Sequence, residues 1–182
     1  EYTPEQKAVT TGLLLYRGYL HKSGENSNAS LACFFEDESL ASELFDFYNS
    51  LSLKVSYMSG EQFFGQHIRR SYVFVLRAHP YLTDKIELWG TGSSKSHSSA
   101  SQIEDVSETT YALLYRLIGN RGYDTNDWAV FDCSKSDIRP YLLRDLLEEY
   151  DSFVETNSYT EVVLKNANKF FADIEGNPIG AV

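Results

Sequence analysis

The sequence predicts an α+β fold built from two repeats, and three observations support this. An apolar helical run ends at Arg-Gly-Tyr twice, at residues 17–19 and at 121–123. Each is followed by a loop, a short apolar strand and an amphipathic helix. A serine-rich stretch separates the two copies. We therefore predict repeats at 1–92 and 107–182, joined by a linker at 93–106 within one compact unit.

The first helix is predicted to begin at Thr3 and to end near Gly18. Thr3 suits the N-cap, Pro4 suits the first helical position, and Gln6 completes a capping box. Further along the first copy, the alternation and helical spacing of apolar residues predict strands at 29–36, 53–58 and 69–78, a turn at 59–66, a helix at 39–50 and a short helix or edge segment within 81–89.

The second copy repeats this order. We expect a helix capped by Ser107 and a later helix at 136–150 with Pro140 in its first turn. Strands are expected at 128–133 and 160–166, with a last short helix at 168–174.

Gly12 and Gly119 lie in or near the two predicted motif helices. A mid-helix glycine costs about 1 kcal/mol relative to alanine, which a helix tolerates best where another backbone comes close. We therefore expect the two helices to pack face to face, with both glycines at the contact. The alternative for Gly119 is that it only ends its own helix.

Charge argues against a typical nucleic-acid binder. The formal net charge is −10, whereas nucleic-acid binders usually carry a basic surface. The charge is uneven, because residues 1–100 hold 9 basic and 11 acidic side chains while residues 101–182 hold 7 and 15. An anionic ligand should prefer the first half. The aromatic content of 14% suits base stacking, a core or an interface equally.

Other classes are excluded by the absence of their signals. No apolar run approaches the roughly 18 residues of a membrane span, and no signal segment opens the sequence, so we expect a cytoplasmic or organellar protein. The four histidines and two cysteines lack metal-ligand spacing, so no metal site and no cofactor are expected. Cys33 and Cys133 are expected as a reduced pair buried in strands, with a disulfide left open.

The segment 12–20, Gly-Leu-Leu-Leu-Tyr-Arg-Gly-Tyr-Leu, resembles the motif of the LAGLIDADG homing endonucleases, which often read Gly-Leu-Leu-Leu-Gly-Asp-Gly-x-Leu there. The second copy keeps Leu117, Ile118 and the closing Gly122, but Arg116 stands where the first glycine falls. The resemblance implies two pseudo-symmetric repeats whose motif helices pair at the centre and whose antiparallel sheets form a saddle over DNA. It also implies an acid at the end of each motif helix that binds a divalent metal for phosphodiester cleavage.

Both acid positions are read here as arginine, Arg17 and Arg121. A guanidinium stays protonated and cannot bind Mg²⁺, so no catalytic residue is assigned and cleavage is expected to be absent. Arginine can instead bind phosphate or carboxylate through two parallel hydrogen bonds. We therefore hypothesise an anion clamp. The alternatives are that each arginine pairs with a neighbouring acid such as Asp124 or Asp127, or that these acids are displaced metal ligands.

The first predicted sheet offers more cations than the second. Strand alternation predicts a polar face on which Ser56 and Ser71 lie between basic side chains. This face could contact phosphates and base edges. An ordinary solvated sheet face is the alternative. The second repeat supplies only Lys135 and Lys165 at comparable places, among many acids. Together with the arginine pair, the candidate nucleic-acid-binding residues are Arg17, Arg121, Lys22, Lys54, Arg69, Arg70 and Arg77.

Three functions follow from this resemblance and the charge pattern. The first is a catalytically inactive relative that binds DNA or structured RNA. The second is a protein-interaction subunit of a larger ribonucleoprotein assembly, or an inhibitor, that uses the acidic second repeat as its interface. The third is an active endonuclease.

Overall fold

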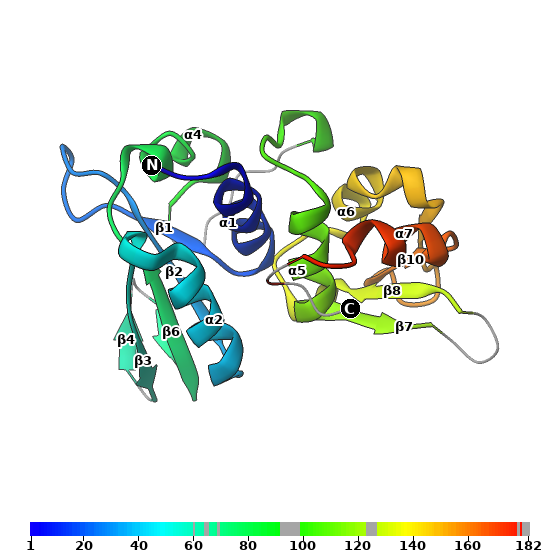
Figure 1. Cartoon of the computed structure of the whole chain (residues 1–182), viewed down its shortest axis with the longest axis horizontal. Coiled ribbons are helices and arrows are strands. Elements are labelled where there is room, and N and C mark those ends of the chain that lie inside the picture. Colours follow the sequence, from blue (N-terminus) through cyan, green and yellow to red (C-terminus); the bar gives the residue numbers. More distant parts are fainter. Residues whose placement is uncertain are drawn as a thin grey trace. The chain divides into compact units, whose positions relative to one another are not determined.

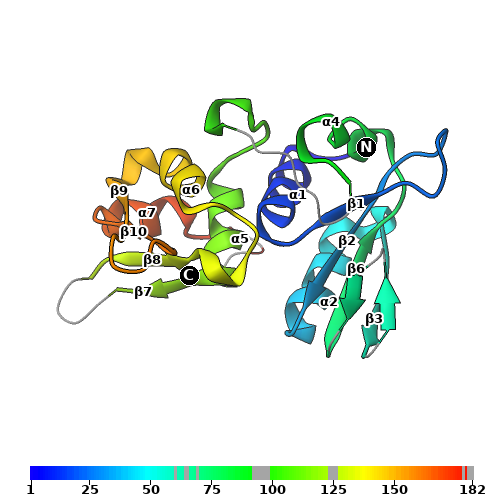
Figure 2. The ribbon, with the colours of Figure 1, turned by 180° about the vertical axis from the view of Figure 1, so that it is seen from behind.

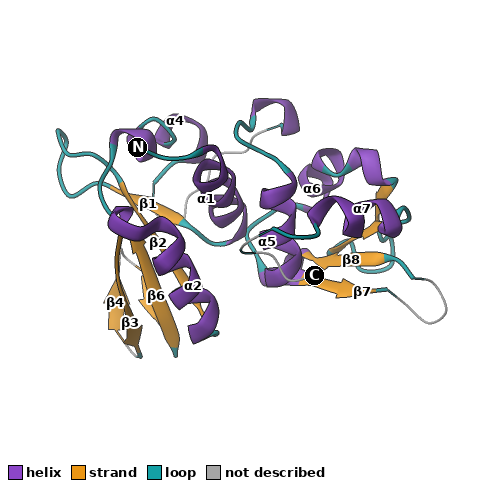
Figure 3. Ribbon diagram, viewed as in Figure 1, coloured by secondary structure: helices purple, strands orange, loops and turns teal. Residues whose placement is uncertain are grey.

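The computed structural model describes residues 1–59, 61–63, 66–68, 70–91, 99–122, 127–177 and 179, and it has an α+β architecture (Figure 3). The chain forms two compact units. The first unit consists of Glu1–Tyr2 and Arg17–Ser98, and the second of Thr3–Tyr16 and Ser99–Val182. The helix at the start of the chain therefore belongs to the second unit.

Among its described residues, the first unit contains an antiparallel sheet, a separate strand pair, three α-helices and the 3-10 helix Asn49–Leu51. Its elements are β1 (Tyr19–His21), β2 (Ser30–Phe35), α2 (Glu38–Tyr48), β3 (Ser52–Met58), β4 (Glu61–Phe63), β5 (Gln66–Ile68), β6 (Ser71–Leu76), α3 (Pro80–Thr83) and α4 (Ile86–Trp89). The four-stranded sheet has the order β1-β2-β6-β3, and β4 pairs with β5. This strand pair corrects the turn predicted at 59–66.

Among the residues described for it, the second unit contains a four-stranded antiparallel sheet, four α-helices and short 3-10 helices. Its elements are α1 (Pro4–Tyr16), α5 (Glu108–Ile118), β7 (Gly119–Arg121), β8 (Ala129–Asp132), α6 (Pro140–Leu146), β9 (Ser152–Val154), β10 (Glu161–Leu164) and α7 (Ala167–Ile174). The strand order is β7-β8-β10-β9. Each sheet thus places its strands in the chain order first, second, fourth, third, apart from the β4–β5 pair.

The capping predictions for α1 and α5 are confirmed. The Thr3 amide donates to the Gln6 side chain at 2.9 Å, and the Gln6 amide donates to the Thr3 hydroxyl at 3.1 Å. In α5, the Ser107 hydroxyl accepts from the Thr109 amide at 3.3 Å. These bonds satisfy N–H groups that have no partner inside the helix.

The two motif helices, α1 and α5, pack together inside the second unit. The Thr110 hydroxyl of α5 donates to the Ala8 carbonyl of α1 at 2.8 Å. A Cβ built on Gly12 would lie 2.9 Å from Leu113 Cδ2 and 3.5 Å from the Thr110 carbonyl oxygen. The close approach predicted at Gly12 is therefore confirmed.

Gly119 does not join this contact, so that half of the prediction is wrong. Gly119 follows the last residue of α5, and its added Cβ would fall on Tyr115 of the same helix, 2.5 Å from that carbonyl oxygen. The alternative, that Gly119 ends its own helix, is the one observed. Its φ of −92° and ψ of 153° are extended, so it also opens β7.

Other boundaries shift for local reasons. Helix α6 begins at Pro140 rather than at 136, because proline occupies the first helical turn, where its missing N–H is not needed. Cys33 lies in β2 as predicted, whereas Cys133 opens the 3-10 turn Cys133–Lys135 rather than lying in a strand. Both cysteines are free and buried. None of the described helices combines the length and hydrophobicity that crossing a bilayer requires.

Candidate nucleic-acid interface

The first sheet has one face covered by α2 and a second face turned away from it (Figures 1 and 2). Tyr48 of α2 contacts Phe74 of β6, with ring centroids 5.6 Å apart, so Phe74 and Leu76 point toward the helix. The alternation predicted for this strand is thus observed. We call the opposite side the far face of the first sheet.

The centre of this far face is apolar, which corrects the polar face predicted from the sequence. Ala32, Val73 and Val75 form a buried cluster, and Phe34 and Met58 pack against it. These residues occupy paired positions on β2, β3 and β6, so the sheet register brings them together. The alternation of residues within β6 predicts which of its side chains share a face. It does not predict which residues of β2 and β3 lie beside them.

Two predicted cations, Arg70 and Arg77, lie immediately before and after β6, and both are exposed. Lys22 follows β1, is half-buried, and donates from Nζ to the Glu25 carbonyl at 2.8 Å. Lys54 lies in β3, but its side chain is outside the described part of the structure, and Arg69 is outside it altogether. By strand alternation Arg77 falls on the far face with Val73 and Val75, whereas Lys22 and Arg70 continue the alternation of the covered side, so the described cations do not fill the far face.

Four acids of the first unit lie on or cap the helix that covers one side of its sheet. Glu38, Glu43 and Asp46 lie on α2, which covers the near face. Asp37 caps this helix, and its carboxylate accepts from the Ser39 amide at 2.9 Å. These acids are therefore on the covered side of the sheet, whereas Glu36 follows β2 directly and Glu25 lies beside Lys22.

Arg17 and Arg121 occupy different positions in the fold. Arg17 is the first residue after α1 and is exposed. Arg121 is the last residue of β7, three positions beyond the end of α5. Counted from the first residue of β1 and of β7, Arg121 corresponds to His21, and Arg17 corresponds to Leu117. The alignment of the two arginines is therefore wrong, although neither corresponding position holds an acid.

The Arg121 side chain is engaged by its own unit. Its Nη1 lies 3.1 Å from the Asp127 carboxylate, and its guanidinium stacks 4.2 Å from the Phe171 ring centroid on α7. This is the neighbouring-acid alternative for Arg121. The side chain is still 62% exposed, so the ion pair is weak and open to water. Asp124 lies outside the described residues.

The second sheet also has one face covered by helices. Phe131 of β8 contacts Tyr115 of α5 and Phe170 of α7, at centroid distances of 5.8 and 5.7 Å. Because alternate residues point to opposite faces, Val130 and Val163 lie on the side turned away from these helices, the far face of the second sheet.

The far face of the second sheet carries acids and aromatic rings. Asp132 on β8 lies directly opposite Glu161 on β10. Trp128 contacts Phe153 at 5.9 Å, and Lys165 Nζ lies 5.2 Å from the Phe153 ring centroid. The second unit therefore has a pair of opposed carboxylates that the sequence analysis did not predict. Only strand register could have shown that pair.

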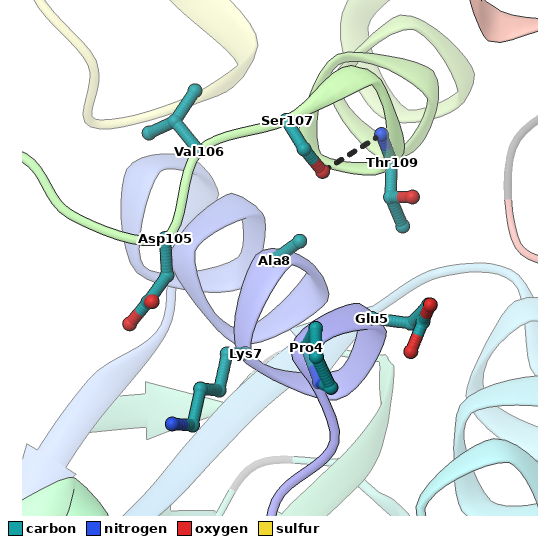
Figure 4. A pocket seen from close by; sticks show the side chains of 8 residues that line it. All are labelled: Pro4, Glu5, Lys7, Ala8, Asp105, Val106, Ser107 and Thr109. Atoms are coloured by element: carbon teal, nitrogen blue, oxygen red, sulfur yellow. Dashed lines mark hydrogen bonds between the residues drawn. The ribbon is translucent and has the colours of Figure 1, made fainter.

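A separate pocket of about 430 Å³ lies at the N-terminal ends of α1 and α5 (Figure 4). Two acids, Glu5 and Asp105, face it together with one cation, Lys7, so its charge does not suit phosphate. The other lining residues are Pro4, Ala8, Val106, Ser107 and Thr109. Within the described part of the chain, no group of three or more His, Cys, Asp or Glu side chains is placed to hold a metal ion.

Comparison with solved structures places this arrangement among known folds. The homing endonuclease I-WcaI bound to its DNA recognition sequence matches with a TM-score of 0.71 and 11% sequence identity, over 94% of this chain and 80% of that chain. This is the LAGLIDADG homing endonuclease fold. No family model and no curated protein matches the sequence, so the likeness to this fold is structural. The α+β architecture with two antiparallel sheets, predicted from the repeat, is confirmed.

Proposed function

We propose that this protein binds double-stranded DNA without cutting it, and that the far face of the first sheet provides most of the contacts. The observation that carries the proposal is the match, over most of the chain, to a homing endonuclease whose structure contains its DNA recognition sequence. A duplex must approach a sheet from the side that helices leave accessible. In the first unit Arg77 falls on that side, Lys22 and Arg70 lie at the ends of strands β1 and β6, and the acids of α2 lie on the opposite side.

The proposed lack of cleavage follows from the residues at the ends of the motif helices. LAGLIDADG nucleases bind divalent metal through an acid there, but residues 13–20 and 112–121 contain no Asp or Glu. Arg17 takes the acid position after α1, and Leu117 is its counterpart in α5. Neither a guanidinium nor an aliphatic side chain can ligate Mg²⁺.

Binding is tested by fluorescence anisotropy with a labelled duplex at increasing salt. Replacing two phosphate-contacting cations in Arg70→Ala/Arg77→Ala should weaken binding by about tenfold or more and flatten the salt dependence by about two counterions. Lys135→Ala/Arg139→Ala in the second unit removes the same charge and is the matched control. If no duplex binds even at low salt, the proposal fails and a protein-interaction role gains support. If a structured RNA binds more tightly than DNA, RNA is the partner.

Cleavage is tested by incubating supercoiled plasmid with the protein and Mg²⁺ or Mn²⁺. The plasmid should remain supercoiled. Nicking that disappears in the Arg17→Ala variant would show an active nuclease and overturn the account of that position.

A further inference from the structure

We propose that Asp132 and Glu161 exclude nucleic-acid phosphate from the second sheet, so that they limit both the affinity and the length of the DNA contact. This inference rests on the DNA binding proposed above and assigns a specificity-determining role to two residues of the other unit. It concerns the far face of the second sheet, defined by Val130 and Val163 on its central strands.

The geometry places both carboxylates on that face. Asp132 and Glu161 are directly opposite each other on antiparallel strands, and opposite residues project to the same side. Phe131 and Val162 are also paired, and Phe131 points toward α5 and α7, so the neighbouring acids must point away from those helices. Both acids are half-buried, which reduces their screening by salt.

The pairing itself favours a role beyond stability. Like charges directly opposite on neighbouring strands destabilise a sheet, so such a pair is a cost to folding. Asp132 offsets part of this cost, because its carboxylate accepts from the Ser134 amide at 3.1 Å and caps the turn that follows β8. Capping needs an oxygen acceptor there but does not need a negative charge.

A cation of this face, Lys165 at the other end of β10, is already placed against an aromatic ring. Lys165 Nζ lies over Phe153, which also contacts Trp128, so the corner of the face is apolar with a single positive charge. A phosphate at the Asp132–Glu161 end of this face would meet two carboxylates directly opposite each other. The first unit differs, because Arg77 falls on its far face, Arg70 lies at the start of β6, and its α2 acids lie on the opposite side.

The test replaces both acids by neutral isosteres. Asp132→Asn keeps an oxygen that can accept from Ser134, and Glu161→Gln keeps the side-chain shape, so the double variant should fold; a melting temperature close to wild type checks this. It should bind a generic 30-base-pair duplex at least fivefold more tightly than wild type at about 50 mM salt. Its salt dependence should steepen by at least about one counterion.

Glu148→Gln/Glu175→Gln is the matched control. These exposed acids follow α6 and α7 on the helix side of the sheet, and their replacement makes the same change in net charge. The control should change affinity by less than twofold. Equal tightening in both double variants would show a net-charge effect alone and overturn the inference.

The outcomes separate this inference from the proposed function. If wild type binds the duplex and the Asp132/Glu161 replacement does not change the affinity, the inference is wrong and the proposed function is not affected. Binding that appears only after the replacement supports the inference and contradicts the proposed function. If neither protein binds duplex, both fail.

Discussion

Tyr2 ties the start of the chain to the first unit through its ring. The ring centroid lies 4.6 Å from that of Tyr81 and 4.9 Å from that of His79, and the residue is 7% exposed. Its hydroxyl has no hydrogen-bond partner among the described residues, and burial raises its pKa. The ring therefore stabilises this attachment while the hydroxyl opposes it.

Tyr2→Phe should accordingly match or exceed wild type in stability, by up to about 1 kcal/mol, because it removes a buried polar group that has no partner. Tyr2→Ala should lose about 3 kcal/mol, since it also removes the ring. Urea unfolding measures both. A loss of more than 1 kcal/mol in the phenylalanine variant would mean that the hydroxyl is satisfied.

Cys133 should be chemically inert in the folded protein. Burial, with a smaller contribution from Asp132, raises the pKa of its thiol to about 12, and only the thiolate is nucleophilic. Because the folded-state pKa is raised, this group favours the folded state fully below pH about 9 and progressively less as pH rises toward 12.

Alkylation with iodoacetamide at pH 8, followed by peptide mass spectrometry, measures this reactivity. The Cys133 peptide should stay unmodified in the native protein and become modified in urea. Rapid native modification would contradict the burial of the thiol.

Arg121 shows why sequence reasoning fell short at the residue scale. The repeated Arg-Gly-Tyr suggested that Arg17 and Arg121 end equivalent helices, but α5 stops three residues earlier and β7 takes up the remainder. The cross-strand pairing that makes Gly119–Arg121 a strand is non-local, so a three-residue motif could not reveal it. The ion pair with Asp127 was among the alternatives because the acid is close in sequence.

At the scale of elements, the contact between α1 and α5 depends on small side chains and one buried hydroxyl. Gly12 admits Leu113, and Thr110 donates to the Ala8 carbonyl. A second bond joins α1 to the segment before α5, from the Thr11 hydroxyl to the Glu104 carbonyl at 3.2 Å. Each of these side-chain hydrogen bonds should add about 1 kcal/mol.

Thr110→Val tests this, because it keeps the branched shape and removes the hydroxyl, which donates to Ala8 and also accepts from the Ser107 amide at 3.2 Å. The free energy of unfolding should fall by about 1 kcal/mol, whereas Thr110→Ser, which retains the hydroxyl, should lose less. Guanidinium unfolding gives both values. Equal losses in the two variants would show that the methyl group, not the hydrogen bond, holds the helices together.

Elements with local signals were predicted best. The caps at Thr3 and Ser107 involve groups within three residues of each other, and the structure contains both. Strand β9, Ser152–Val154, was missed because three residues are too few for an alternation pattern and its order comes from pairing with β10. The start of α6 was predicted too early, at residue 136. The spacing of apolar residues does not define a helix start, and the helix begins at Pro140.

At the scale of the whole molecule, the sequence predicted the α+β class and the uneven charge, but not the surfaces on which that charge acts. Alternation divides a strand between two faces, yet only tertiary packing decides which face helices cover. The apolar centre around Val73 and Val75, and the opposed Asp132 and Glu161, both depend on register between strands distant in sequence. Together they make the two sheets different surfaces, one apolar at its centre and one with opposed carboxylates.

Photo-crosslinking of the wild-type protein to a duplex at low salt, with peptide mapping of the products, tests the central claim most directly. The account predicts cross-linked peptides from β1, β2, β3, β6 and their flanking residues, and uncut duplex in the same sample with Mg²⁺ present. Cross-links confined to β7, β8 and β10, or their complete absence at low salt, would contradict it.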